Sequence, residues 1–74
     1  MKFINRKTVE EMTTLSRSAI YALMDKDRTR LYDPSFPRPR SLGPQKVAWV
    51  LSEVEEWMES RPVSAAHINE DDEP

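Results

Sequence analysis

The spacing of apolar residues near the start of the chain predicts two short helices separated by a tight turn. Asn5 is a suitable N-cap for the first helix, and Ile4 and Val9 have the spacing of a hydrophobic staple across that helix start. Ser16 can cap the second helix. In that second segment the apolar residues recur at helical spacing and form a single arc, which contains Ala19, Ile20, Leu23 and Met24. Residues 13–15 remain for the turn.

The opposite arc of the second helix is the surface that a partner would meet. At 100° per residue it carries Arg17, Ser18, Tyr21, Ala22 and Asp25. Two helices that join through a short turn, with the second one presenting a polar arc, have the layout of a helix-turn-helix. That motif places its second helix in the major groove of DNA.

A hairpin and a third helix are predicted from the second half of the chain. Two extended segments, 40–42 and 46–50, flank a tip at Gly43-Pro44, and Val47 and Trp49 alternate onto one face as in a half-buried strand. Residues 52–55 have the pattern of a capping box that opens a third helix. Its apolar stripe is Val54, Trp57 and Met58, and Pro62 ends it.

These elements predict an α+β fold that is mostly α: a small winged helix-turn-helix with a two-stranded wing and a C-terminal helix. Residues 1–62 form the DNA-binding domain and residues 63–74 a disordered acidic tail. The polar segment 25–35 has no clear period, so the sequence leaves open whether it extends the second helix by a turn or forms a loop.

Charge is distributed unevenly along the chain, and the formal net charge of −2 hides this. Residues 1–46 contain ten Lys or Arg and five Asp or Glu, whereas residues 47–74 contain one Arg and eight acids. Because charges are screened beyond about 8 Å at physiological salt, the basic part can still meet phosphate. The acidic tail is open to three interpretations: a solvated end, a competitor for the basic face, or a docking segment for a basic partner.

Composition excludes several classes of protein. No cysteine and a single histidine leave no disulfide and no usual structural zinc site, so we expect no metal and no cofactor. The longest apolar run, Val47 to Leu51, is far shorter than the roughly 20 residues of a membrane-spanning helix, and no signal-peptide core follows the first four residues. We expect a soluble cytoplasmic protein without a membrane partner.

Three residues on the exposed arc are candidates for DNA contact. Arg17 can fork onto guanine or clamp a phosphate, and the alternative is a solvated surface arginine. Ser18 can donate to a phosphate or a base edge, or can bond only its own backbone. Tyr21 can touch a phosphate or a thymine methyl group, or can serve as a lid on the core.

Basic residues around the predicted hairpin are the second set of candidates. Arg38, Arg40 and Lys46 suit a wing that holds minor-groove phosphates, although charged residues also protect exposed strand edges from unwanted pairing. Arg28 and Arg30 can add phosphate contacts or can pair with neighbouring aspartates, and the sequence does not decide between these roles.

Nothing in the sequence predicts an enzyme. The glutamates of the third helix have no histidine or metal partner nearby, and acids early in a helix are favoured by its dipole. His67 lies in the tail and has no predicted role. There is neither a nucleophile–base pair nor a glycine-rich phosphate loop.

Several short phrases, in order, resemble the AlpA family of phage and genomic-island regulators. They are residues 14–21 (TLSRSAIY), 36–39 (FPRP), 48–49 (AW) and 52–57 (SEVEEW), and the resemblance covers roughly residues 3–61. The family is similar in fold to the winged-helix domains of MerR-type regulators and phage excisionases. The chain departs from the pattern at Thr14, where glycine is usual, and at Ser35, which follows a longer connection than usual. A β-branched residue at positive φ would be strained, so a local difference in the turn is expected.

The resemblance implies a sequence-specific binder of double-stranded DNA in a bacterial, nucleoid-associated setting. The favoured role is that of an excisionase-like recombination directionality factor, which bends attachment-site DNA and aids an integrase of the tyrosine recombinase class. It would also regulate the integrase promoter, and further copies of the chain would bind side by side. One alternative is an AlpA-type transcriptional activator or repressor. Another, of a different class, is a protein-binding adaptor that works through the acidic third helix and tail.

Overall fold

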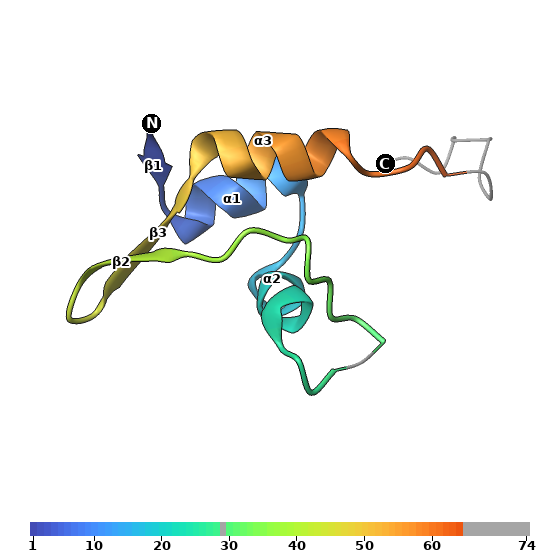
Figure 1. Ribbon diagram of the computed structural model, residues 1–74, viewed down its shortest axis with the longest axis horizontal. Coiled ribbons are helices and arrows are strands. Elements are labelled where there is room, and N and C mark those ends of the chain that lie inside the picture. Colours follow the sequence, from blue (N-terminus) through green and yellow to red (C-terminus); the bar gives the residue numbers. More distant parts are fainter. Residues whose placement is uncertain (29, 65–74) are drawn as a thin grey trace.

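The computed structural model describes residues 1–28 and 30–64, and six secondary-structure elements follow one another within them (Figure 1). They are β1 (Phe3–Ile4), α1 (Arg6–Thr13), α2 (Arg17–Met24), β2 (Arg40–Gly43), β3 (Lys46–Val50) and α3 (Leu51–Glu59). The order of strand, two helices, hairpin and helix confirms the predicted α+β class and is compatible with a winged helix. The predicted tail lies outside the described residues from residue 65 onward.

Both predicted N-caps are confirmed. The Asn5 side chain accepts a hydrogen bond from the amide of Thr8 at 2.9 Å, and the Ser16 hydroxyl accepts one from the amide of Ala19 at 3.1 Å. Each bond satisfies an amide that has no partner within its own helix. The caps therefore fix where α1 and α2 begin, and with them which residues of α2 face outward.

The turn between α1 and α2 keeps its shape although it lacks a glycine. Thr14 adopts φ +62°, in the left-handed region, and its amide donates to the carbonyl of Glu10 at 2.8 Å. Thr13 supports the turn from the other side, since its hydroxyl donates to the carbonyl of Val9 at 2.8 Å and accepts from the amide of Leu15 at 3.2 Å. Thr14 therefore carries the conformational strain expected of a β-branched residue at positive φ.

The three strands form one antiparallel sheet in the order β1-β3-β2. Ile4 pairs with Trp49 and Arg40 pairs with Ala48, so β3 is the central strand. The β2–β3 hairpin confirms the predicted wing and extends away from the helices (Figure 1). An extra residue at Leu42 makes a β-bulge, which increases the local twist of the hairpin.

Two details of the second half were predicted wrongly. Val47 does not share the burial of Trp49: its side chain is 46% exposed, whereas the base of the strand from Ala48 to Val50 is buried throughout. The capping box is also absent, because α3 begins at Leu51, directly from β3, and its N-cap Val50 makes no side-chain bond. The amide of Leu51 instead donates to the carbonyl of Lys2 at 2.7 Å, so a backbone group just before β1 satisfies the first amide of α3.

The core lies where the sheet meets the three helices. Its largest fully buried side chains are Trp49, Phe36, Ile20, Val9 and Val54. The Trp49 indole donates to the carbonyl of Pro37 at 3.2 Å, so its polar nitrogen is satisfied. Phe3, next to Ile4 in β1, is 41% exposed because β1 is an edge strand and alternate side chains point away from the core.

α2 ends at Met24, and residues 25–28 and 30–35 form no further helix, which settles the alternative that the sequence left open. The amide of Asp33 donates to the carbonyl of Leu23 at 2.9 Å. Ala22, which was predicted to lie on the exposed arc, is only 5% exposed, and it lines a groove together with Leu31 from the returning segment. Ala22 and Leu31 thus border the same groove, although nine positions separate them in the chain.

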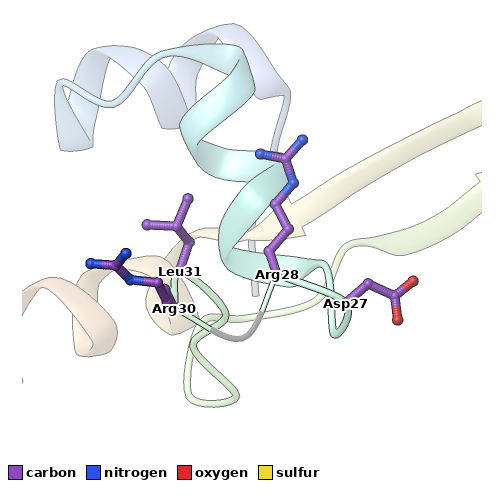
Figure 2. A pocket seen from close by; sticks show the side chains of 4 residues that line it. All are labelled: Asp27, Arg28, Arg30 and Leu31. Atoms are coloured by element: carbon purple, nitrogen blue, oxygen red, sulfur yellow. The ribbon is translucent and has the colours of Figure 1, made fainter.

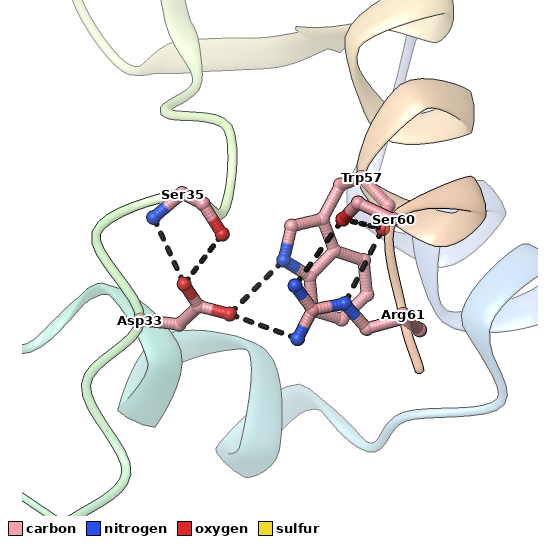
Figure 3. A network of polar contacts seen from close by, with 5 residues as sticks. All are labelled: Asp33, Ser35, Trp57, Ser60 and Arg61. Carbon is pink, nitrogen blue, oxygen red and sulfur yellow. Dashed lines mark hydrogen bonds and ion pairs between the residues drawn. The ribbon is translucent and has the colours of Figure 1, made fainter. Parts of the chain in front are cut away.

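Asp33 ties this loop to the end of α3 (Figure 3). Its carboxylate accepts from the Ser35 hydroxyl at 2.6 Å, from the Trp57 indole at 3.1 Å and from Arg61 at 3.2 Å. The hydrogen bonds from Ser35, then those from Trp57 and the charge of Arg61, hold the pKa of the Asp33 carboxyl below its usual range. The loop is therefore held in one place relative to α2 and α3.

No helix within residues 1–28 and 30–64 combines the length and the apolar character that a membrane span requires.

Candidate nucleic-acid interface

The outward face of α2 gathers the three residues predicted on the exposed arc. Arg17, Ser18 and Tyr21 are all exposed and line a shallow hollow of about 290 Å³, together with Asp25 and Arg28. The N-cap bond of Ser16 places the first two of them in the first helical turn. The structure thus brings these three candidates together on one accessible surface, which we call the α2 face.

Arg17 is available to a partner from this surface. Its guanidinium lies over the ring of Tyr21, 5.8 Å from the ring centroid, and within the described part of the chain it forms no ion pair. A cation over an exposed ring is restrained only weakly, by about 0.5–1 kcal/mol. Arg17 therefore keeps both its charge and its freedom to reach outward.

Asp25 lines the same hollow as the α2 face and pairs with a neighbouring arginine there. Its carboxylate lies 3.6 Å from the Nε of Arg28 and also accepts from the amide of Asp27 at 3.0 Å. Both partners are well exposed, so this ion pair contributes little to stability. Its effect is to orient Arg28 into the same hollow as Arg17.

Arg6 is a further basic residue close to Tyr21 of the α2 face, a proximity that the sequence did not reveal. Its Nε donates to Glu10 at 2.8 Å, one helical turn along α1. The hydrogen bond to Glu10 is the main cause that raises the pKa of Arg6, and Tyr21 contributes to the same shift. The Arg6 side chain therefore comes close to α2, a proximity that depends on how α1 and α2 pack.

The two arginines before the hairpin lie apart from the α2 face. Arg38 donates to the Tyr32 hydroxyl at 3.1 Å and lies 5.9 Å from the centroid of that ring. Arg40 donates to Glu53 of α3 at 2.8 Å. Both line a hollow of about 430 Å³ that also contains Glu56. Glu53 of α3 thus holds Arg40 in an ion pair, whereas Arg38 shares only the hollow with the two acids.

The hairpin tip combines a cation with exposed apolar side chains. Lys46 opens β3 immediately after the turn and is exposed. Leu42 and Val47 are 43% and 46% exposed, although both are large aliphatic residues. Of the wing candidates, Lys46 is the one at the tip.

Arg30 occupies a third position, in the loop. With Asp27, Arg28 and Leu31 it lines a shallow hollow of about 490 Å³ (Figure 2). In that view Leu31 lies between Arg30 and Arg28, and Asp27 extends to the far side of Arg28. Because Arg28 also borders the α2 face, positive charge continues from that face into the loop.

Comparison with known proteins identifies the family. The family model described as "Prophage CP4-57 regulatory protein (AlpA)" matches residues 2–62. The chain belongs to the AlpA family. The match includes every element of the structure, from β1 to α3, and confirms the resemblance seen in the sequence.

Two relatives extend this assignment. The "DNA-binding transcriptional activator AlpA" of Escherichia coli (strain K12) is 31% identical over 61 residues, which cover 82% of this chain and 86% of that protein. "Uncharacterized protein ORF88" of Enterobacteria phage P4 is 40% identical over 60 residues, which cover 81% of this chain and 60% of that protein. No solved structure matches the chain. The AlpA family is a family of regulators and not of enzymes.

Proposed function

We propose that this AlpA-family protein is a DNA-binding transcriptional regulator of a phage or prophage, with α2 in a major groove of duplex DNA. The observation that carries the proposal is the α2 face, where Arg17, Ser18 and Tyr21 are exposed together and the acid in the same hollow, Asp25, pairs with Arg28 and not with Arg17. The similarity to a DNA-binding transcriptional activator supports it. An exposed arginine in the first turn of a recognition helix suits guanine O6 and N7 or a phosphate.

The hairpin would occupy the adjacent minor groove. Lys46 at its tip would meet phosphates, and Arg28 and Arg30 would add backbone contacts from the loop. Arg38 and Arg40 would contact DNA only after breaking their hydrogen bonds to Tyr32 and Glu53. In this arrangement α2 supplies base readout, while the wing and loop fix orientation.

The test is binding of the full chain to promoter and attachment-site DNA of its own locus, measured by fluorescence anisotropy at several salt concentrations. Arg17→Ala should weaken binding about tenfold or more and lower the salt slope by about one. Lys2→Ala is the matched control, because it removes one exposed positive charge beside β1, away from α2 (Figure 1). Equal losses in both variants would refute a specific α2 face.

We also propose an architectural role in excision, as a recombination directionality factor that aids an integrase. The observation that favours it is the apolar hairpin tip, where Leu42 and Val47 are exposed. Apolar side chains that enter a minor groove can separate base steps and kink the duplex. Deleting the gene and measuring excision of the host element tests this role, and unchanged excision would reject it.

Several copies would act together on DNA. One chain of 74 residues covers few base pairs, so we expect copies side by side on direct repeats. Footprinting should show repeated protected blocks, and a single isolated block would contradict this expectation.

A further inference from the structure

An apolar groove runs between α2, the 25–35 loop and the end of α3, on a part of the surface that the proposed DNA contacts do not use. It has a volume of about 330 Å³ and is lined by Leu15, Ala19, Leu23, Leu31, Trp57 and Arg61. Leu31 is 52% exposed, so an aliphatic side chain at the edge of the groove is open to a partner. We call this surface the α2–α3 groove.

The groove adjoins positive charge. Leu31 lines both the α2–α3 groove and the loop hollow that contains Arg28 and Arg30. Figure 2 shows Leu31 between these two arginines. A ligand that fills the groove and continues past Leu31 therefore meets two guanidinium groups. Arg30 forms no ion pair within the described residues, whereas Arg28 pairs with Asp25 at 3.6 Å and shares the hollow with Asp27, so an acidic ligand would have to displace Asp25 from Arg28. The surface fits a short segment that carries one aliphatic residue followed closely by acids.

The chain itself contains such a segment after α3. Ile68 is the single large aliphatic residue within 65–74, and residues 70–73 are Glu-Asp-Asp-Glu. We propose that residues 65–74 fold back onto the body, with Ile68 in the α2–α3 groove and residues 70–73 beside Arg28 and Arg30. The aliphatic side chain would gain burial, and the acids would gain partners of opposite charge.

Chain length permits this return. The groove includes Arg61, two residues after α3 ends at Glu59. Ile68 is seven residues beyond Arg61, which corresponds to a reach of roughly 24 Å when extended. Residues 70–73 follow after a further two to five residues, or roughly 7–17 Å. Because Arg61 itself lines the groove, the first of these lengths is enough for a chain that reverses its direction there.

The docked segment would regulate DNA binding, a consequence that rests on the proposed function, whereas the docking itself does not. Arg28 borders both the loop hollow and the α2 face, so acids placed there compete with phosphate for the same guanidinium. Non-specific duplex binds through phosphates alone and would be excluded more strongly than a target that also offers base contacts to Arg17.

Docking is tested without DNA, on the full chain. Because the protein has no cysteine, Asn69→Cys provides a single attachment point for a nitroxide label. We expect the label to broaden the NMR signals of the Leu31 methyl groups and the Trp57 indole, and Ile68→Ser to restore them. Val63→Ser is the matched control, since Val63 is 94% exposed and is also an aliphatic residue after α3.

Three outcomes would overturn the proposal. The first is absence of broadening at Leu31 and Trp57, and the second is broadening that Ile68→Ser leaves unchanged. The third is broadening that occurs only between labelled and unlabelled copies in a mixed sample, which would assign the groove to a second chain.

The regulatory consequence has its own measurement. Replacing residues 70–73 by Gln-Asn-Asn-Gln removes their four negative charges. This variant should bind non-specific duplex at low salt up to about fivefold more tightly, which corresponds to the free energy of one exposed ion pair. If the label shows docking but this variant binds duplex no more tightly than the parent, the docking proposal is supported and the proposed inhibition of DNA binding is refuted. If neither the parent nor the variant binds duplex at all, the proposed function falls while the docking result is unaffected.

Discussion

Replacing Thr14 by glycine should stabilise the protein, because this threonine holds a backbone conformation that its side chain opposes. Its φ is +62°, and it is the one residue described with a positive φ. For an L-residue with a Cβ atom this conformation costs about 1–2 kcal/mol. Thr14→Gly removes that cost, while the bond from its amide to Glu10 needs no side chain.

The expected gain is smaller than the strain. Glycine loses more backbone entropy on folding, which offsets about 0.5–1 kcal/mol. The Thr14 hydroxyl donates to the carbonyl of Thr13, but this bond is exposed and its loss matters little. We expect a net stabilisation of about 0.5–1 kcal/mol, which corresponds to a rise in Tm of about 2–8 °C for a domain of this size.

The assay is urea unfolding followed by tryptophan fluorescence, since Trp49 is fully buried and Trp57 packs on the core. Thr14→Gly should raise the midpoint without changing the m value. Thr14→Ala should bring no gain, because alanine keeps the Cβ atom. Thr13→Gly should lower stability by about 1 kcal/mol or more, because Thr13 is helical and its hydroxyl bonds Val9.

The three variants together test whether the left-handed conformation of Thr14 is a source of strain. If Thr14→Gly and Thr14→Ala have the same stability, the left-handed conformation is not a source of strain. If Thr13→Gly is stabilising as well, glycine acts through the unfolded state or the turn has a different shape in solution.

Three further predictions concern a cap, a carboxylate and an ion pair. Ser16→Ala should lower the free energy of unfolding by about 1 kcal/mol, because it removes the N-cap of α2, and thermal unfolding by circular dichroism measures this. The lowered pKa of Asp33 means that its contribution is fully present above its unfolded pKa and is lost as pH falls through the folded one. Urea midpoints should therefore decline below about pH 4, and Asp33→Asn should flatten that decline; an unchanged slope would contradict the network. Glu53→Gln should free Arg40 from its 2.8 Å partner and tighten duplex binding about two- to fivefold in anisotropy titrations, and weaker binding would show that the pair positions the wing.

The sequence correctly predicted the features that depend on residues close together in the chain. Asn5 and Ser16 are caps whose bonds reach only three residues ahead, so the residue order alone is enough to place the starts of α1 and α2. The grouping of Arg17, Ser18 and Tyr21 followed from helical spacing alone, and the structure places them in one hollow. Whether they contact DNA stays a prediction.

Features that depend on distant partners were missed. Ala22 is buried beside a loop that returns to α2, and Arg40 is held by Glu53, thirteen residues away. The start of α3 was misplaced because the partner of the Leu51 amide is Lys2, at the other end of the described chain. Residue patterns within a short window do not contain these contacts.

The pairing of β1 with β3 also dictates the order in which this fold can be completed. Ile4 and Trp49 are neighbours in the sheet, although 45 positions separate them in the chain. Closing so long a loop is slow compared with winding the two short helices, which form from nearby residues. A nascent chain that has not yet reached residue 50 therefore offers β1 no partner, and the N-terminal residues stay outside the sheet until β3 has been synthesised.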